Sequence, residues 1–229
     1  LESRLADCSE FLIIEDMRRE VNLAAECFGK KLSDDAGIYV EIGCGKGQFI
    51  ITKAMKNPDA YFIGIEGQET VILRAAEKAI AAVKSAAAAG QRAILPNNLM
   101  FVNGFVNDMA ALFPENRLEG IYLNFSDPWP NARHEKRRLT YHKRLLDYAY
   151  AVRPGGFMEI KTDNDDLFEF TLEEIGQASC LEICEMTRDL HGADCTYDAR
   201  LVTTEYEDKF REGGHKINYV RVIVNKSNK

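Results

Sequence analysis

Short apolar runs alternate with segments of helical pattern along most of this chain. Such runs predict buried strands, and their alternation with helices is typical of a parallel sheet covered by helices. We expect an α/β fold with a mostly parallel, doubly wound, Rossmann-like sheet and an antiparallel C-terminal strand. The expected strands are 38–42, 60–65, 99–102, 121–123, 157–161, 181–186 and 219–224, and the expected helices are 48–56, 70–89, 141–151 and 165–179.

The length of 229 residues suits one large domain or two small ones, and the continuous α/β pattern favours one. We expect a helical N-terminal segment over residues 1–36 and a single domain over residues 37–229. With 46% hydrophobic and 28% charged residues, the chain can form a full core. No apolar run has the length of a membrane span, no signal segment opens the chain, and the six cysteines form no CxxC pair. A cytoplasmic protein with reduced thiols and no membrane partner is the expectation.

Polar side chains follow four of the predicted strands. They are Glu41–Gly47, Glu66, Asn124–Asp127 and Thr162–Asp163. In a doubly wound sheet, ligands bind beyond the carboxyl ends of the strands, near the switch in strand order. We therefore expect these four turns to meet at one crevice.

The turn after the first predicted strand contains Gly43-x-Gly45-x-Gly47. A dinucleotide fingerprint would place glycine or alanine at position 48, which is Gln48, and the acid Glu41 would repel a pyrophosphate. A cationic sulfonium and amino acid would be attracted instead, which favours S-adenosylmethionine. Glu66 ends the next strand, where a carboxylate can accept hydrogen bonds from both ribose hydroxyls. The alternative is a glycine turn that serves packing alone.

The stretch 121–139 begins as a buried strand and turns polar at Asn124. Asp127 and Trp129 each precede a proline, which predicts extended backbone and stiffly aimed side chains. Trp129 could stack on a base or pack into the core, and both readings stay open. The net charge of −7 argues against nucleic acid, but residues 133–144 concentrate basic side chains. This basic cluster, which could instead be a solvated helix start, suits phosphate binding; it contains Arg133, Lys136, Arg137, Arg138, Lys143 and Arg144.

Six motifs together make a specific resemblance: 39–49 (YVEIGCGKGQF), 62–66 (FIGIE), 122–130 (YLNFSDPWP), 133–140 (RHEKRRLT), 161–164 (KTDN) and 204–210 (TEYEDKF). From about residue 37 to its end, the chain resembles the bacterial tRNA (guanine-N7-)-methyltransferases, a family of class I S-adenosylmethionine-dependent methyltransferases. The resemblance implies that tRNA is the substrate, with the variable loop as the modified region. It implies no metal.

The resemblance also assigns roles to residues. Asp127 matches the catalytic position. The implied cofactor-binding residues are Glu41, Gly43, Gly45, Gly47, Glu66, Phe105, Asn124 and Asp127. The family usually has Asp or Asn where Phe105 stands, and a slip of the alignment would place Asn103 or Asn107 there. The expected substrate-binding residues are Asn131, Arg133, Lys136, Arg137, Arg138, Asp163, Thr204, Glu205, Tyr206 and Glu207.

The chemistry fits these residue types, because guanine N7 carries no proton and needs no base to remove one. Asp127 can accept hydrogen bonds from guanine N1–H and N2–H₂ and stabilise the cation that methylation creates. Without the resemblance, Asp163 would be read as a helix cap and residues 204–207 as a loop. The family usually has lysines where Asn131 and Ala132 stand, which weakens the basic character of the expected RNA surface.

Three rival functions remain open at this point. They are a methyltransferase acting on a small molecule, a tRNA-binding protein without catalysis, and a nicotinamide oxidoreductase, which Gln48 and Glu41 disfavour. The sequence leaves monomer and homodimer undecided.

Overall fold

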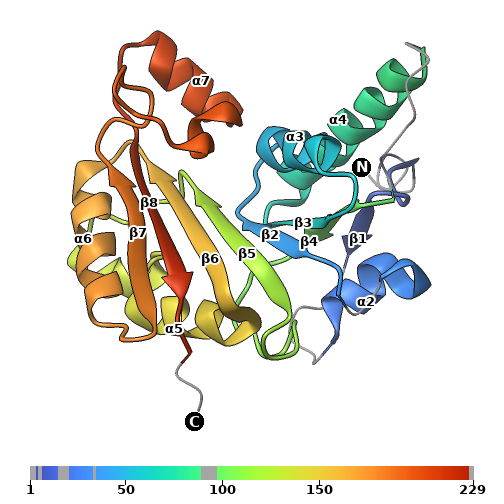
Figure 1. The fold of residues 1–229 in the computed structure, drawn as a ribbon. Coiled ribbons are helices and arrows are strands. Elements are labelled where there is room, and N and C mark those ends of the chain that lie inside the picture. Colours follow the sequence, from blue (N-terminus) through green and yellow to red (C-terminus); the bar gives the residue numbers. More distant parts are fainter. Residues whose placement is uncertain (1–3, 5–6, 15–20, 33–34, 89–96, 227–229) are drawn as a thin grey trace. The chain divides into compact units, whose positions relative to one another are not determined.

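The computed structural model describes residues 4, 7–14, 21–32, 35–88 and 97–226. The chain forms two compact units, Leu1–Pro114 and Glu115–Lys229. Both units are of the α/β type (Figure 1). The prediction of one domain over residues 37–229 stays a prediction. No helix among the described residues is long and apolar enough to cross a membrane.

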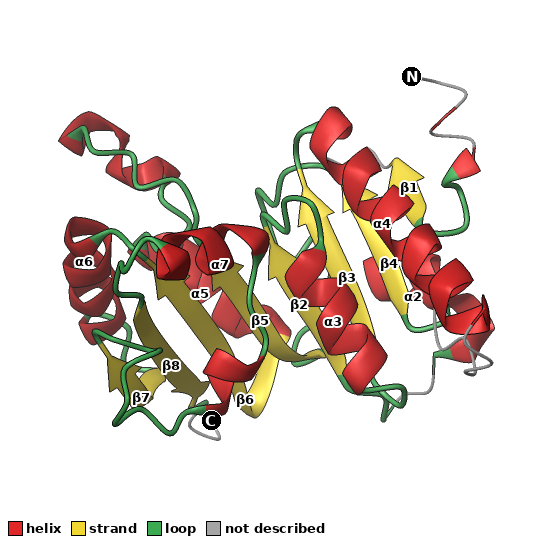
Figure 2. Ribbon diagram, turned by 90° about the horizontal axis from the view of Figure 1, so that it is seen from above, coloured by secondary structure: helices red, strands yellow, loops and turns green. Residues whose placement is uncertain are grey.

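The first unit contains four parallel strands in the order β1-β4-β3-β2. Helices α3 and α4 pack against each other and against β3 and β4 (Figure 2). Their contact buries a core that includes Ile50, Phe62, Leu73 and Phe101. The elements are β1 Leu12–Ile14, α2 Leu23–Phe28, the 3₁₀ helix η1 Gly29–Lys31, β2 Ile38–Ile42, α3 Gln48–Lys56, β3 Tyr61–Glu66, α4 Glu69–Ala88 and β4 Leu99–Asn103.

The sequence predicted a helical N-terminal segment, but this segment is not wholly helical. The apolar run at β1 forms a parallel strand beside β4, and Phe101 N donates a hydrogen bond to Phe11 O at 2.7 Å. Phe11 and Leu12 are buried. The prediction failed because three residues are too few to show a strand period. The helical prediction is confirmed at α2, while residues 15–20 lie outside the described residues.

The second unit contains strands in the order β5-β6-β8-β7. β5 and β6 are parallel, and β8 runs antiparallel to β6 and β7, which confirms the predicted antiparallel C-terminal strand. β6 begins five residues earlier than expected, since Val152 already pairs with Leu118. The elements are β5 Leu118–Asn124, η2 Ala132–Arg137, α5 His142–Ala151, β6 Val152–Thr162, α6 Asp165–Gly176, β7 Leu181–Thr187, η3 Asp198–Leu201, α7 Glu205–Glu212 and β8 Asn218–Val224.

Helix α7 precedes β8 in the second unit and carries residues 205–207 of the predicted site. It lies at the end of the sheet where β6 ends and β8 begins (Figure 1). A small core beneath this region contains Leu190, Ala199, Ile217 and Tyr219. The carboxyl ends of β5 and β6 are therefore close to a helix that the sequence did not predict.

Candidate functional site

The glycine turn between β2 and α3 depends on left-handed backbone. Gly43, Gly45 and Gly47 have φ values of 74°, 55° and 75°, a region that side-chain-bearing residues rarely adopt. Two amides of the turn, those of Gly43 and Cys44, donate to Ile65 O at 2.8 and 3.1 Å. The end of β3 thus fixes the turn, and Gly47 caps α3.

Substituting Gly47 tests this geometry. A Cβ at Gly47 would lie 2.8 Å from Ala75 Cβ and 3.0 Å from the Phe101 ring. We expect Gly47→Ala to lower the free energy of unfolding by about 1–3 kcal/mol in urea denaturation, through clash and backbone strain. Gly176→Ala is the control, because a Cβ there meets nothing within 4 Å. Equal stability of the two variants would contradict a strained, tightly packed turn.

Two carboxylates surround the glycine turn. Glu66 accepts hydrogen bonds from Gly45 N at 3.1 Å and from Gln68 N at 2.9 Å. Glu41 ends in the interior beside the turn, with 1% of its surface exposed. Burial, together with the negative charges of Glu41 and Glu66, raises the pKa of the Cys44 thiol well above its usual value. The two carboxylates beside the turn suit a cationic ligand such as a sulfonium with an α-ammonium group.

Phe105 follows β4 and presents an exposed ring beside Glu66. Its side chain is 67% exposed, and its ring occupies the space over Gly67, where a Cβ would come within 2.2 Å of it. Asn103, one alternative adenine contact, donates its side-chain amide to Glu66 O at 2.9 Å. Asn107, the other alternative, is exposed. Phe105 thus offers an aromatic face and no polar group.

The loop that carries Asp127 is held by its neighbours. Asn124 is buried at the end of β5, and Phe125, with a φ of 52°, donates its amide to Lys161 O at 2.8 Å. Asp127 itself is exposed. Trp129 has a φ of 40°, so the prediction of extended backbone at this residue is wrong.

Arg138 explains the conformation of that loop. Its guanidinium donates to Pro128 O at 2.9 Å and to Trp129 O at 3.1 Å, which holds Trp129 in the left-handed region despite the following proline. The Trp129 ring is half-buried and contacts Arg137, whose guanidinium carbon lies 5.0 Å from the ring centre. His134 packs edge-on against the same ring. Trp129 therefore packs against its own loop and does not fill the core.

The basic cluster divides into exposed and structural members. Arg133, Lys136 and Arg137 are exposed, whereas Arg138 is half-buried, with its guanidinium also 4.2 Å from the Phe170 ring centre. Asn131 caps η2 by accepting from Arg133 N at 3.0 Å. Arg138 and Asn131 thus stabilise the conformation of the loop, whereas the sequence predicted that both residues contact the substrate.

Asp163 and Tyr206 are brought together at the end of β6. Tyr206 Oη donates to Asp163 Oδ2 at 3.4 Å, and burial and the Asp163 charge raise the pKa of the tyrosine. The Tyr206 ring is 5.0 Å from that of Phe125. Asn164, not Asp163, caps α6, because it accepts from Leu167 N at 2.8 Å. The reading of Asp163 as a cap is therefore wrong, and its carboxylate faces Tyr206.

Residues 204–207 begin α7 through a capping box. Glu207 N donates to Thr204 Oγ1 at 2.9 Å, and Thr204 N donates to the Glu207 carboxylate at 3.3 Å. Glu205 is half-buried and Tyr206 is 44% exposed. Glu207 has no exposed surface, and its predicted contact with substrate stays a prediction. The pattern Thr-x-x-Glu is a capping-box signature, and it could have predicted this helix.

Two groups of predicted site residues result, one in each unit. Glu41, the glycine turn, Glu66 and Phe105 gather in the first unit. In the second unit, Asn124 and Asp127 follow β5, and Asp163 joins Tyr206. The prediction that all four turns share one crevice stays a prediction. The described residues include no group of His, Cys, Asp and Glu that could hold a metal ion.

Comparison with known proteins shows close relatives of this chain. Residues 35–220 match a protein family described as "Putative methyltransferase". The tRNA (guanine-N(7)-)-methyltransferase of Mesoplasma florum is 40% identical over 95% of this chain and 92% of its own. The enzyme of the same name from Latilactobacillus sakei is 40% identical over 82% of this chain and 81% of its own.

Solved structures show the fold more broadly. An antibiotic-related methyltransferase superposes with a TM-score of 0.60 at 16% identity, covering 93% of this chain and all of its own. The 16S rRNA methyltransferase KamB gives 0.58 at 12% identity, over 87% of this chain and 93% of its own. The fold is that of the class I, Rossmann-like methyltransferases. By its relatives and its fold, the chain belongs to the tRNA (guanine-N(7)-)-methyltransferase family.

Proposed function

We propose that this protein transfers a methyl group from S-adenosylmethionine to N7 of a guanosine in tRNA, in the variable loop. The observation that carries the proposal is the arrangement of the second unit. Asp127 is exposed on a loop that is held by the Arg138 guanidinium and by the backbone amide of Phe125. The exposed cations Arg133, Lys136 and Arg137 follow it in the chain. A carboxylate for the base and cations for its phosphates thus come from one stretch of chain.

The first unit offers the groups that S-adenosylmethionine requires. When bound, the cofactor supplies an activated methyl group on a positively charged sulfur. Glu41 and the amides of the glycine turn suit its amino acid, and the Glu66 carboxylate suits the ribose hydroxyls. The Phe105 ring suits stacking on the adenine. We propose these residues of the first unit as its cofactor-binding residues.

Asp127 orients the guanine and stabilises the charge that develops on it. N7 attacks with its lone pair, so no residue has to remove a proton first. Positive charge moves onto the purine ring as the bond forms, and the N1–H and N2–H₂ groups become stronger donors to a carboxylate. Asp163 and the partly exposed Tyr206 provide further polar and aromatic surface for the base. We expect Asp127 to act as an electrostatic and orienting group.

Binding of tRNA depends on the exposed members of the basic cluster. We expect Arg133→Ala and Lys136→Ala each to weaken tRNA binding and to reduce the salt slope of log Kd by about 1, because each removes one phosphate contact. Arg138→Ala should instead leave this slope nearly unchanged and lower the unfolding midpoint, since its guanidinium binds two backbone carbonyls. Filter binding at several salt concentrations and thermal unfolding separate the two effects. Equal salt slopes in all three variants would contradict this division.

Methyl transfer tests the function itself. Labelled S-adenosylmethionine is incubated with the protein and either an unmodified tRNA transcript or free guanosine and GTP. The proposal predicts label on the transcript alone. Label on the free compounds alone would favour a small-molecule methyltransferase. Salt-sensitive tRNA binding without any transfer would favour a binding protein that lacks catalysis.

A further inference from the structure

Lys161 is a buried lysine at the end of β6 that the proposed chemistry does not use. Only 1% of its surface is exposed. Its ammonium donates to Ala199 O at 2.7 Å and Val202 O at 2.9 Å, and it contacts both oxygens of Glu207 at 3.2 and 3.1 Å. One buried cation therefore attaches both the η3 segment and the first turn of α7 to β6.

The same residue is also connected to the Asp127 loop and to Asp163. Its carbonyl accepts from Phe125 N at 2.8 Å, two residues before Asp127. Asp163 follows Lys161 by two residues. Lys161 is thus linked to three parts of the second unit: through its backbone to the Asp127 loop and to Asp163, and through its side chain to the helix that carries Tyr206.

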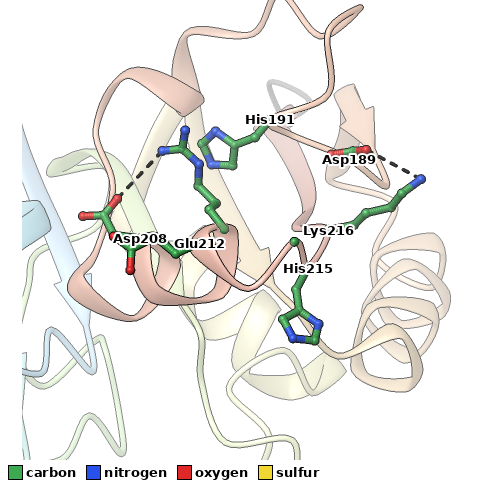
Figure 3. A pocket seen from close by; sticks show the side chains of 8 residues that line it. Asp189, His191, Asp208, Glu212, His215 and Lys216 are labelled. Atoms are coloured by element: carbon green, nitrogen blue, oxygen red, sulfur yellow. Dashed lines mark ion pairs between the residues drawn. The ribbon is translucent and has the colours of Figure 1, made fainter.

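His191 is a further hydrogen-bonding partner of the Glu207 carboxylate. Its Nε2 lies 2.7 Å from Glu207 Oε1, and 13% of its side chain is exposed. His191 lines a pocket of about 660 Å³ together with residues from the end of α7 and the segment after it (Figure 3). In this pocket Lys216 pairs with Asp189 and Arg211 pairs with Asp208. Glu207 therefore holds α7 between a buried lysine and a histidine near the surface.

Stability alone does not account for such an arrangement. Replacing a buried ion pair with well-packed apolar residues is often neutral or stabilising. A charged network with several fixed donors and acceptors does, however, impose one geometry on the elements that it joins. Here the elements it joins carry Tyr206 and Asp163, whose hydrogen bond is 3.4 Å long.

We propose that Lys161, Glu207 and His191 form a positioning triad, which sets Tyr206 against Asp163 and so shapes the guanosine site without touching RNA. The proposal rests on the proposed tRNA methylation. In this proposal Glu207 acts indirectly, through the position of α7. His191 also affects the reaction, although it acts only through the Glu207 carboxylate.

His191 variants test the triad with the least disturbance to folding. We expect His191→Ala to lower kcat on tRNA about tenfold, the loss typical for a removed hydrogen bond to a charged group. His191→Gln, which keeps a donor, should recover part of that loss. The tRNA Kd should stay within about twofold, because the exposed cations are untouched. Lys216→Ala, in the same pocket but without a contact to Glu207, is the matched control and should match the wild type.

If His191 had a merely structural role, His191→Ala would reduce the number of competent molecules and leave the kcat of each unchanged. The kcat is therefore expressed per molecule able to bind S-adenosylmethionine, counted by the stoichiometry of cofactor binding. If His191→Ala reduces only this count, or if its kcat per competent molecule equals that of the wild type, the proposal is overturned. Glu207→Gln gives a second test, and it should lower kcat more than His191→Ala because both Lys161 and His191 lose a charged partner. A wild type that is inactive on tRNA would contradict the proposed function, which is a separate outcome.

Discussion

Asp127→Ala is expected to lower kcat for tRNA methylation by about 10²–10³-fold, the usual cost of removing a group aimed at developing charge. The carboxylate is exposed, and its loop is held by Arg138 and by the backbone of Phe125. Its removal should therefore change the reaction and leave the fold intact. Single-turnover methyl transfer with saturating tRNA measures this effect.

The controls for Asp127 separate charge from shape. Asp127→Asn keeps one acceptor and should fall between alanine and the wild type. Asp166→Ala removes an exposed acid from the first turn of α6, and it should retain nearly full activity. Trp129 is the chain's single tryptophan, so an unchanged emission spectrum in Asp127→Ala would show an intact loop. Activity of Asp127→Ala within threefold of the wild type would remove Asp127 from the reaction.

Glu66→Gln is expected to weaken S-adenosylmethionine binding by about 10–100-fold, as expected for the loss of hydrogen bonds to a charged acceptor. Glu66 combines two tasks, because it accepts from the Gly45 and Gln68 amides and is the acid placed for the ribose. The substitution should weaken both the binding of the ligand and the hydrogen bonds that hold the turn. Isothermal titration calorimetry measures the affinity directly.

Glu69→Gln is the matched control for this second prediction. Glu69 lies three residues away, in the first turn of α4, and it makes no contribution to the glycine turn in the proposed site. We expect its affinity for the cofactor to equal that of the wild type. Equal affinity in Glu66→Gln as well would show that the cofactor binds elsewhere.

The sequence predicted the fold class well, because short apolar runs and the turn residues between strands and helices are local signals. The glycine turn is an example, since its three glycines all have positive φ. β1 was missed because a three-residue strand gains its stability from pairing with β4, which no local pattern reveals. The left-handed backbone at Trp129 was missed for a similar reason, as Arg138 holds it from nine residues away.

The sequence names candidate site residues, but it does not show how their side chains are arranged. The resemblance grouped residue 163 with residues 204–207, and the structure shows one hydrogen bond within this group, from Tyr206 to Asp163. Glu207 is engaged by a lysine 46 residues earlier in the chain, and sequence spacing carries no sign of such a pairing. Asn164 caps α6, a role that Asp163 could also have filled. The Thr204–Glu207 capping box was a local signal that was present and overlooked.

The most direct test of the central claim is to compare tRNA transcripts made with guanosine and with 7-deazaguanosine, which has carbon in place of N7. Methyl groups are supplied as labelled S-adenosylmethionine, and the labelled site is located by cleavage specific for N7-methylguanosine. The account predicts label at one guanosine of the variable loop in the normal transcript and none in the 7-deaza transcript. Equal labelling of both transcripts would contradict methylation at N7.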